Sequence, residues 1–275
     1  NDRVWGTAAS FGELGDTVPW DRAEDVVAEI QTEQQERFQI QKGFGVQRVL
    51  SDENLGSIIA MTFNEFGHLI AARENGPLLL ISDKDEDGIP EHVTVYCDQV
   101  TNCHGILALN GDIFVTGDGP EGSALYHLSD ADRNGELEGV KAIVKFDHKS
   151  GEHGPHGLRL GPDGMIYVAV GNHAKAIGET GDGETLRVSY EGDLLPRYED
   201  PNGHAMGVKA PGGTIIRTDT NGSMVEIVAG GLRNAYDLVF HPGGSLFVHD
   251  SDMESDLQTS WYRPTALFDV PEGGE

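Results

Sequence analysis

A short hairpin pattern that occurs four times along the chain constrains its fold more than any other sequence feature. Each copy has a turn glycine, one further residue, and then two apolar residues that open a strand. The turn glycines are Gly67, Gly111, Gly164 and Gly244. A preceding strand is predicted before each turn, at 58–63, 105–109, 157–160 and 237–240. The glycines are 44, 53 and 80 residues apart, and blade-sized periods of about 40–50 residues are typical of β-propellers.

The repeats therefore predict an all-β fold, a β-propeller that occupies residues 43–275. We count three complete blades and the first hairpin of a fourth. An insertion at about 175–211 explains the longest spacing, and 213–222 and 225–228 supply the outer strands of that blade. Because propellers close with about 4–8 blades, we expect a further chain or a further segment to complete the ring. The alternative is a complete small open sheet of four hairpins.

Residues 1–42 differ from the rest and are predicted to form an N-terminal extension with one helix at 21–41. Val26, Val27, Ile30 and Phe38 would form its apolar face. Since the chain begins at Asn1 with no methionine and no signal peptide, we expect a processed or trimmed product.

Charge and cysteine content limit the partners of the chain. With 19 Lys and Arg against 46 Asp and Glu, the net charge is −27, which disfavours nucleic acid and anionic membranes. No apolar run approaches the roughly 18 residues of a membrane span. Cys97 and Cys103 are either a small disulfide loop, which would indicate an oxidising compartment, or two free thiols.

An acidic loop occurs twice in the same register, 47 residues apart. The first loop contains Asp83, Asp85, Asp87 and Glu91, and the second contains Asp130, Asp132, Asn134 and Glu138. Alternate oxygen-bearing residues around a glycine suit calcium, which takes six to eight hard oxygen ligands. Neither loop has a glutamate at position 12, so these are not complete EF-hands. The alternative is a plain turn in which Asp and Asn bind their own backbone.

Histidines mark the entry to successive inner strands. His153 and His156 precede the third inner strand, His104 stands at the matching place one blade earlier, and Tyr236 one blade later. In a propeller these entries face the central channel, so we expect their side chains to converge there. Converging histidines suit proton abstraction, anion binding or metal ligation. The alternative is a set of turn histidines that bind backbone groups.

A third acidic stretch follows the fourth hairpin and contains Asp250, Asp252 and Glu254. These residues are a second candidate cation site, or otherwise a solvated loop. The common signatures of nucleotide binding and of serine or zinc hydrolases do not occur in the sequence.

Two segments resemble the soluble quinoprotein glucose/sorbosone dehydrogenases, namely 153–172 (HGPHGLRLGPDGMIYVAVGN) and 231–247 (GLRNAYDLVFHPGGSLF). The stretch 249–264 is closer to the large planctomycete-type "membrane-bound dehydrogenase" propeller proteins. The resemblance covers about 43–264. It implies a six-bladed, periplasmic or secreted propeller that binds pyrroloquinoline quinone (PQQ) and calcium and oxidises a sugar or an aldehyde.

By segment match, His153 takes the place of the family's catalytic base, with Glu152 before it. Arg233 and Asn234 fall where the family holds the quinone, and we also assign His104, His156 and Asn172 to cofactor binding. Where the family's calcium site offers carbonyls of a Gly-Pro pair, this chain has Asp252 and Met253.

Three functional hypotheses follow. The first is an exported calcium-containing propeller that oxidises a sugar or alcohol by hydride transfer to a quinone. The second is a non-catalytic propeller module that binds a protein or glycan partner in a larger assembly. The third is a metal-dependent propeller of the lactonase type, with Glu152, Asn172 and Asp237 as ligands.

Overall fold

The computed structural model describes residues 38–85, 87–132, 134–178, 212–251, 255–256, 259–260 and 265–271. The chain divides into two compact units, Asn1–Ser51 and Asp52–Glu275. Most of the helix expected at 21–41 lies outside the described residues, and Phe38–Gln41 are not helical. Phe38 is 54% exposed, so this end of the expected helix has no buried apolar face to stabilise it. Within the described part, the one helix is α2 (Asp52–Leu55).

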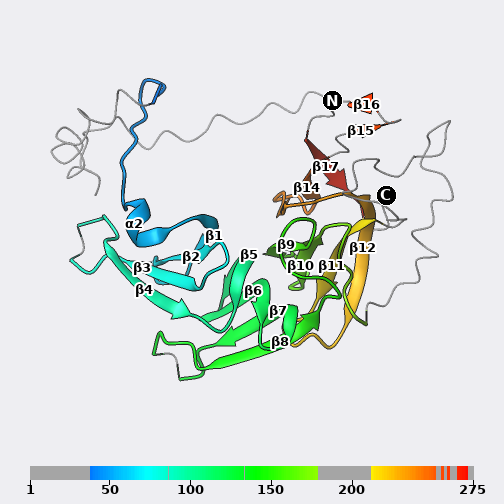
Figure 1. Cartoon of the computed structure of the whole chain (residues 1–275), viewed down its shortest axis with the longest axis horizontal. Coiled ribbons are helices and arrows are strands. Elements are labelled where there is room, and N and C mark those ends of the chain that lie inside the picture. The colour runs from blue at the N-terminus through cyan, green and yellow to red at the C-terminus, as the bar shows by residue number, and fades with distance from the viewer. Residues whose placement is uncertain are drawn as a thin grey trace. The chain divides into compact units, whose positions relative to one another are not determined.

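The larger unit consists of antiparallel sheets that follow one another along the chain (Figure 1). The first sheet has the order β1 (Ile58–Phe63), β2 (Leu69–Arg73), β3 (Leu78–Ser82) and β4 (His92–Cys97). The second has β5 (Thr101–Leu109), β6 (Asp112–Gly119), β7 (Gly122–Ser129) and β8 (Gly139–Lys145). The third has β9 (Pro155–Leu160), β10 (Ile166–Val170), β11 (Gly213–Thr218) and β12 (Val225–Leu232). The fourth has β13 (Asp237–Phe240), β14 (Leu246–Asp250) and β17 (Ala266–Val270), and β15 (Ser255–Asp256) pairs with β16 (Thr259–Ser260).

This arrangement confirms an all-β, propeller-like fold of four sheets, and adds one strand to the hairpin expected in the fourth. The innermost strands β1, β5, β9 and β13 contact one another in sequence order. All four turn glycines have positive φ, between 80° and 94°, a conformation that a glycine adopts at little cost. The four predicted hairpins with glycine turns are therefore confirmed.

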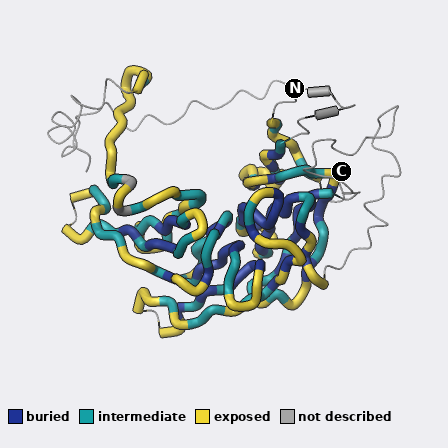
Figure 2. Tube along the Cα trace, in the orientation of Figure 1, coloured by how far each residue is buried: buried dark blue, intermediate teal, exposed yellow. Residues whose placement is uncertain are grey.

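Three apolar cores lie between neighbouring sheets, where Figure 2 shows the buried chain. Ile70 and Leu78 of the first sheet pack with Val115 and Tyr126 of the second. The other face of the second sheet packs on the third, and the third packs on the fourth in the same way. Each inner sheet thus buries both faces, which explains its Val-rich and Ile-rich strands.

Glycines allow the inner strands to approach closely. A Cβ on Gly105 would lie 2.4 Å from the His156 carbonyl oxygen, and one on Gly157 would lie 2.9 Å from the Tyr236 carbonyl oxygen. The Gly157 N–H donates to that same oxygen at 3.0 Å, and the Thr116 hydroxyl donates to the His156 carbonyl at 2.7 Å. These contacts bring the strand entries of the second, third and fourth sheets together.

The outward faces of the first and fourth sheets carry exposed apolar side chains. Met61, Ala71, Leu79 and Val95 form one row across the first sheet. Met61 and Val95 on the edge strands are 70% and 60% exposed, whereas Ala71 and Leu79 between them are buried. Val239 and Leu267 lie on the outward face of the fourth sheet and are 53% and 65% exposed.

The two cysteines are free thiols, so the structure has the second of the two alternatives left open by the sequence. Both are buried in the first core, and burial raises the pKa of the Cys103 thiol. Among the described residues, no helix has the length and apolar character needed to cross a membrane.

Candidate functional site

Three rings from three sheets meet where the innermost strands β5, β9 and β13 begin, a region called the inner end below. The centroid of the His104 ring lies 5.3 Å from that of His156 and 6.3 Å from that of Tyr236. His156 and Tyr236 are 4.8 Å apart. His104 comes from β5, His156 from β9, and Tyr236 directly precedes β13. The entries to successive inner strands therefore converge, although they are 52 and 80 residues apart in the chain.

His153, three residues before His156 in the chain, has a strained backbone conformation. Its φ is 59°, which is uncommon for a residue with a side chain and is found preferentially at functional sites. The side chain is 1% exposed, and its Nδ1 lies 2.6 Å from the Asn172 Oδ1. Since an amide oxygen only accepts, Nδ1 carries the proton and Nε2 is the basic nitrogen. The His173 ring stacks on the His153 ring at 4.4 Å.

The protonation state of His153 suits a base. Burial lowers its pKa most, and the positive charge of Arg233 lowers it further, whereas the Asn172 hydrogen bond raises it. The net shift is downward, so the imidazole is neutral at neutral pH. Asn172 also donates its backbone N–H to the Arg233 carbonyl at 2.8 Å. One residue thus connects the candidate base with the candidate cofactor-binding loop.

Asp250, at the end of β14, organises that loop. Its Oδ2 accepts the Arg233 N–H at 2.9 Å, and its Oδ1 accepts the N–H groups of Asn234 at 2.7 Å and Ser251 at 2.8 Å. The carboxyl group is 5% exposed, and burial raises its pKa despite these bonds. The Arg233 guanidinium in turn donates to the Ser251 hydroxyl at 3.2 Å. Asp250 therefore fixes the backbone from which Arg233 and Asn234 project.

The other two histidines differ in their partners. His156 places Nδ1 3.0 Å from the Ala235 carbonyl oxygen and Nε2 2.9 Å from that of Gly151, which matches the turn-histidine alternative. His104, by contrast, has two buried ring nitrogens with no hydrogen-bond partner. Burial and the neighbouring His156 lower the pKa of His104 to about 4.

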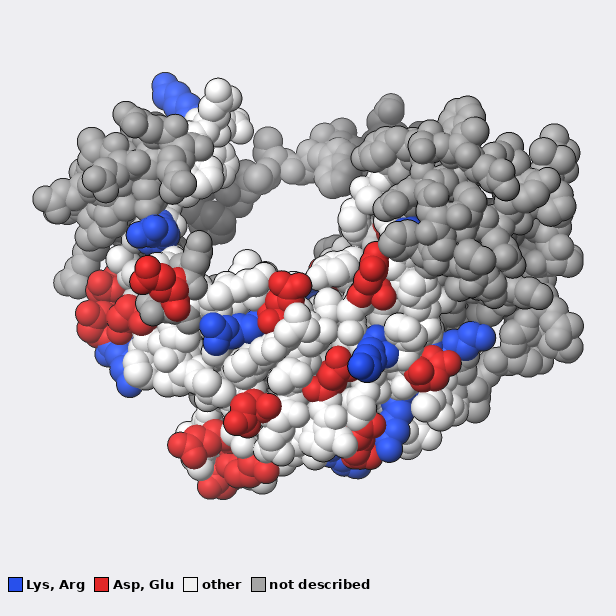
Figure 3. Space-filling view, in the orientation of Figure 1, with Lys and Arg blue, Asp and Glu red and all other residues white. Residues whose placement is uncertain are grey.

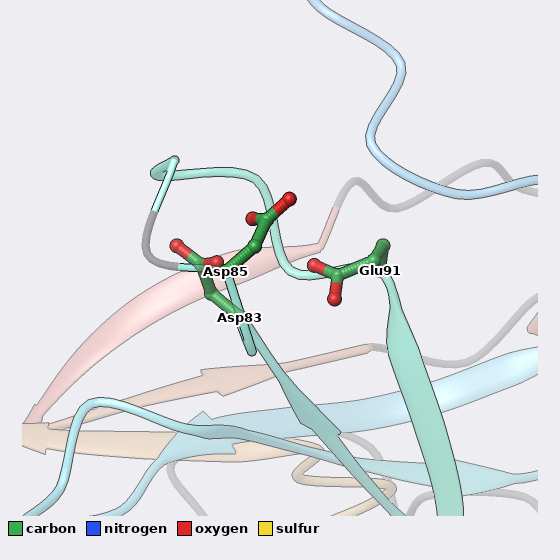
Figure 4. A group of neighbouring side chains, drawn as sticks. All are labelled: Asp83, Asp85 and Glu91. Carbon is green, nitrogen blue, oxygen red and sulfur yellow. The ribbon is translucent and has the colours of Figure 1, made fainter.

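The first acidic loop connects β3 and β4 (Figure 4). Oxygens of Asp83, Asp85 and Glu91 lie within 4.8 Å of one another. The Asp83 Oδ2 accepts the Gly88 N–H at 2.7 Å, while its Oδ1 is buried without a partner. The pKa of Asp85 is raised: its hydrogen bond with Asp87 lowers it, but the charges of Asp87 and Glu91 and partial desolvation outweigh that bond.

The second acidic loop, between β7 and β8, repeats this geometry. Asp130, Asp132 and Glu138 converge within the same 4.8 Å, and the Gly135 N–H donates to the Asp130 Oδ2 at 2.8 Å. Asp130 is 3% exposed. Figure 3 shows acidic side chains gathered over both of these turns. Both clusters have the oxygen ligands of a cation site. Both loops also contain side-chain to backbone bonds of the Asx type, as expected for the alternative of a plain turn.

Some predicted site residues are not in these clusters. Asp87 accepts the Ile89 N–H and acts as a turn residue. Asn134 accepts the Glu136 N–H and also donates its side-chain amide to the Asp132 Oδ2 at 3.1 Å, so it lies against the second cluster. Asp252 and Glu254 lie outside the described residues, as does most of the predicted insertion. Asp237, a ligand in the lactonase hypothesis, forms an ion pair with Arg159 at 2.9 Å.

The sequence placed Tyr236 among the converging side chains and Asp250 in a candidate cation site. It predicted neither the backbone bonds of Asp250 nor the stacking of His173 on His153. Asp250 was detectable, because it continues the alternation of Leu246 and Val248, which point into the core. A charged residue at a buried position of a strand needs hydrogen-bond partners. For the stacking of the His173 ring the sequence offers no comparable signal.

The chain matches one family model, described as "Domain of unknown function (DUF7133)", over residues 31–228. The comparison with curated proteins gives no significant match.

Solved structures share the fold. The PQQ domain of pyranose dehydrogenase from Coprinopsis cinerea has a TM-score of 0.59 at 14% identity, over 86% of this chain and 56% of that chain. A Trichoderma reesei protein of carbohydrate-active enzyme family AA12 has 0.54 at 11%, over 79% and 53%. The PQQ-bound aldose sugar dehydrogenase from Streptomyces coelicolor has 0.51 at 15%, over 80% and 61%. This chain thus spans less than two thirds of each, and at these identities the likeness establishes the fold alone.

Proposed function

This chain belongs to the DUF7133 family, and we propose that its propeller oxidises a hydroxyl or aldehyde carbon of a sugar or a related alcohol, with PQQ as the hydride acceptor. The supporting observation is the linked group of His153, Asn172 and Arg233 at the inner ends of the third and fourth sheets. The solved chains with this fold include PQQ-containing sugar dehydrogenases.

In this proposal His153 is the general base. Its Nδ1–H is directed to the Asn172 Oδ1, so Nε2 accepts the proton of the substrate hydroxyl. The lowered pKa keeps the imidazole neutral and ready to accept. Asn172 is a positioning residue that fixes the tautomer and the ring orientation. Glu152 raises the pKa of His153 and so favours the imidazolium that forms.

The residues at this end fit the chemistry of PQQ, a planar quinone with three carboxylates. Arg233 supplies a positive charge for a carboxylate, and the buried side-chain oxygen of Asn234, which has no partner, is an acceptor that suits the pyrrole N–H of PQQ rather than its carboxylates. When bound, PQQ supplies the electrophilic carbonyl carbon that receives hydride. Asp250 holds the loop of Arg233 and Asn234 in place through three N–H groups, so little reorganisation accompanies binding.

We further propose that each acidic loop binds one calcium ion with a structural role. Three converging carboxylates per loop leave positions for carbonyls and water, as calcium requires. Both loops connect the outermost strands of a sheet and not the inner ends, so the ions would fix the blade periphery rather than take part in the oxidation.

A further β-sheet partner is also part of the proposal. Each interior sheet buries both faces, whereas the edge strands of the first and fourth sheets leave Met61, Val95 and Leu267 on their outward faces at least 60% exposed. Blades from a further segment or chain would cover these faces. This observation favours, as the second candidate function, a module whose role is assembly. Export to the periplasm or the medium remains an expectation from the family resemblance.

The deciding experiment is a titration of the protein with PQQ in the presence of calcium, followed by absorbance under a panel of sugars, polyols and aldehydes. We expect quinone absorbance that bleaches with one substrate class in the wild type. The His153→Ala variant should bind quinone without bleaching, while His241→Ala, an exposed turn variant, should behave as the wild type. Absence of PQQ binding in a folded, calcium-loaded protein would contradict the dehydrogenase and favour the assembly module.

A further inference from the structure

His104 is the most unusual polar residue of the inner end. Both of its ring nitrogens are buried and have no hydrogen-bond partner. Buried polar groups in folded proteins nearly always have a partner, and each exception requires an explanation. Two buried nitrogens without hydrogen bonds destabilise the protein. A ligand that forms hydrogen bonds with both nitrogens would explain why the chain has a histidine here.

The surroundings of His104 determine what such a ligand can be. With a pKa of about 4 the ring is uncharged at neutral pH, so it offers one N–H donor and one nitrogen acceptor. The carboxylates of Asp118 and Glu74 are close enough to act on its pKa, and their negative charge disfavours an anion. A cation could not accept the N–H bond.

We propose that His104 is a specificity-determining residue that hydrogen-bonds two hydroxyl groups of an uncharged polyhydroxylated ligand. A hydroxyl both donates and accepts, so two hydroxyls satisfy the ring in either tautomer. A carboxylate could satisfy only the N–H side. This inference rests on the proposed function and deepens it, because it assigns recognition of the neutral substrate to His104 and leaves the anionic cofactor to Arg233.

Tyr236 is the side chain whose movement would admit the ligand. Its ring contacts both His104 and His156, yet the residue is 40% exposed. Its hydroxyl lies 3.5 Å from the Ile59 carbonyl oxygen, a length at which a hydrogen bond is weak. Rotation of Tyr236 away from Ile59 therefore breaks little and uncovers the His104 nitrogens.

The test is a nitrogen-15 NMR spectrum of the histidine rings, recorded without quinone or any electron acceptor. D-glucose and D-sorbitol are the neutral probes, and succinate is the anionic one. We expect both ring nitrogens of His104 to shift with the polyols and not with succinate, and the signals of His127 to stay constant. His127 is the matched control, because it already bonds Asp112 at 2.8 Å. Omitting quinone separates this test from the oxidation: failure of the redox assay leaves its outcome unchanged.

Two variants complete the design. His104→Phe should abolish polyol binding and leave the melting temperature of the ligand-free protein unchanged or higher, because it removes two unsatisfied atoms. His127→Phe should lower the melting temperature and keep polyol binding. His104 signals that no polyol moves would overturn the proposal, as would polyol binding that survives in His104→Phe. A fall in melting temperature of His104→Phe as large as that of His127→Phe would show that the ring has a structural partner and would equally refute it.

Discussion

Substitution of Asp250 by alanine should destabilise the protein and loosen the Arg233–Asn234 loop together. Alanine leaves the N–H groups of Arg233, Asn234 and Ser251 without their acceptor. Each unsatisfied donor costs about 1–3 kcal/mol, and since all three residues are partly exposed we take the lower end. The expected loss is about 3 kcal/mol of unfolding free energy, or roughly 6–12 °C in Tm for a domain of this size.

Asp250→Asn separates hydrogen bonding from charge. The amide oxygen can still accept from Asn234 and Ser251, but the amide nitrogen would face the Arg233 N–H. One bond is lost, so we expect a loss of about 1 kcal/mol. Because burial raises the pKa of the Asp250 carboxyl, removing the charge also relieves a desolvation cost, which keeps the asparagine variant well above the alanine variant.

The assay is urea unfolding of both variants, with Glu121→Gln as the control. Glu121 forms an exposed ion pair with Lys145 at 2.7 Å, and exposed pairs contribute little. PQQ affinity, measured in the same preparations, should fall in the order of the stability losses. If Asp250→Ala unfolds at the urea concentration of Glu121→Gln, the three N–H bonds do not hold the loop and the reasoning is wrong.

Five further predictions concern the site and the fold. His153→Ala should lower kcat/KM by about 10²–10⁴ in a protein that stays folded. Asn172→Ala should move the acid limb of the wild-type pH profile, which lies below pH 6.5, to still lower pH, because it removes a bond that raises the pKa of His153; an unshifted limb would contradict the positioning role. Removal of calcium by EDTA should lower Tm, since an ion at 100 times its Kd adds about 2.7 kcal/mol of stability, and a scanning calorimeter with and without EDTA checks this. The free energy of unfolding should fall as pH falls from 6.5 toward 4, because in this range His104 is protonated in the unfolded state but stays neutral in the folded state. His104→Phe should flatten this dependence. Gly105→Ala should lower the free energy of unfolding by about 3 kcal/mol, because its Cβ would lie 2.4 Å from a backbone oxygen. Gly164→Ala should lower it by about 1–2 kcal/mol, because its Cβ meets no atom but its φ is +80°. Equal losses in urea unfolding would refute the close approach of the inner strands.

The sheets were predictable because their signal is local and repeated. Turn glycines such as Gly111 and the apolar pairs after them lie within a few residues, and their period is the period of the fold. The acidic loops were predictable for the same reason, since each is one turn between two adjacent strands. The convergence of His104 and His156 followed from register, because equivalent positions of successive blades face one axis.

The features that could not be predicted from the sequence depend on contacts between distant residues. Nothing near Tyr236 indicates that its hydroxyl reaches toward Ile59, 177 residues away. The helix expected at 21–41 was inferred from an apolar face, and amphipathic helices depend on the surface that covers them. Its last four residues, which the structure describes, are not helical, and Phe38 among them is 54% exposed. The state of Cys97 and Cys103 is a matter of side-chain placement, which their spacing of six positions leaves open.

The three histidines of the inner end show that residue type alone does not define a role in this site. His156 has a backbone carbonyl oxygen beside each ring nitrogen. The neutral ring carries one N–H, which binds one of the two carbonyls, so this histidine has a structural role. His153 commits one nitrogen to Asn172 and keeps the other for a proton. Neither ring nitrogen of His104 has a hydrogen-bond partner in the protein, so both can bind a ligand. Since burial lowers the pKa of all three, their charge cannot distinguish them; the number of protein partners does, and it assigns structure, proton transfer and recognition to one residue each.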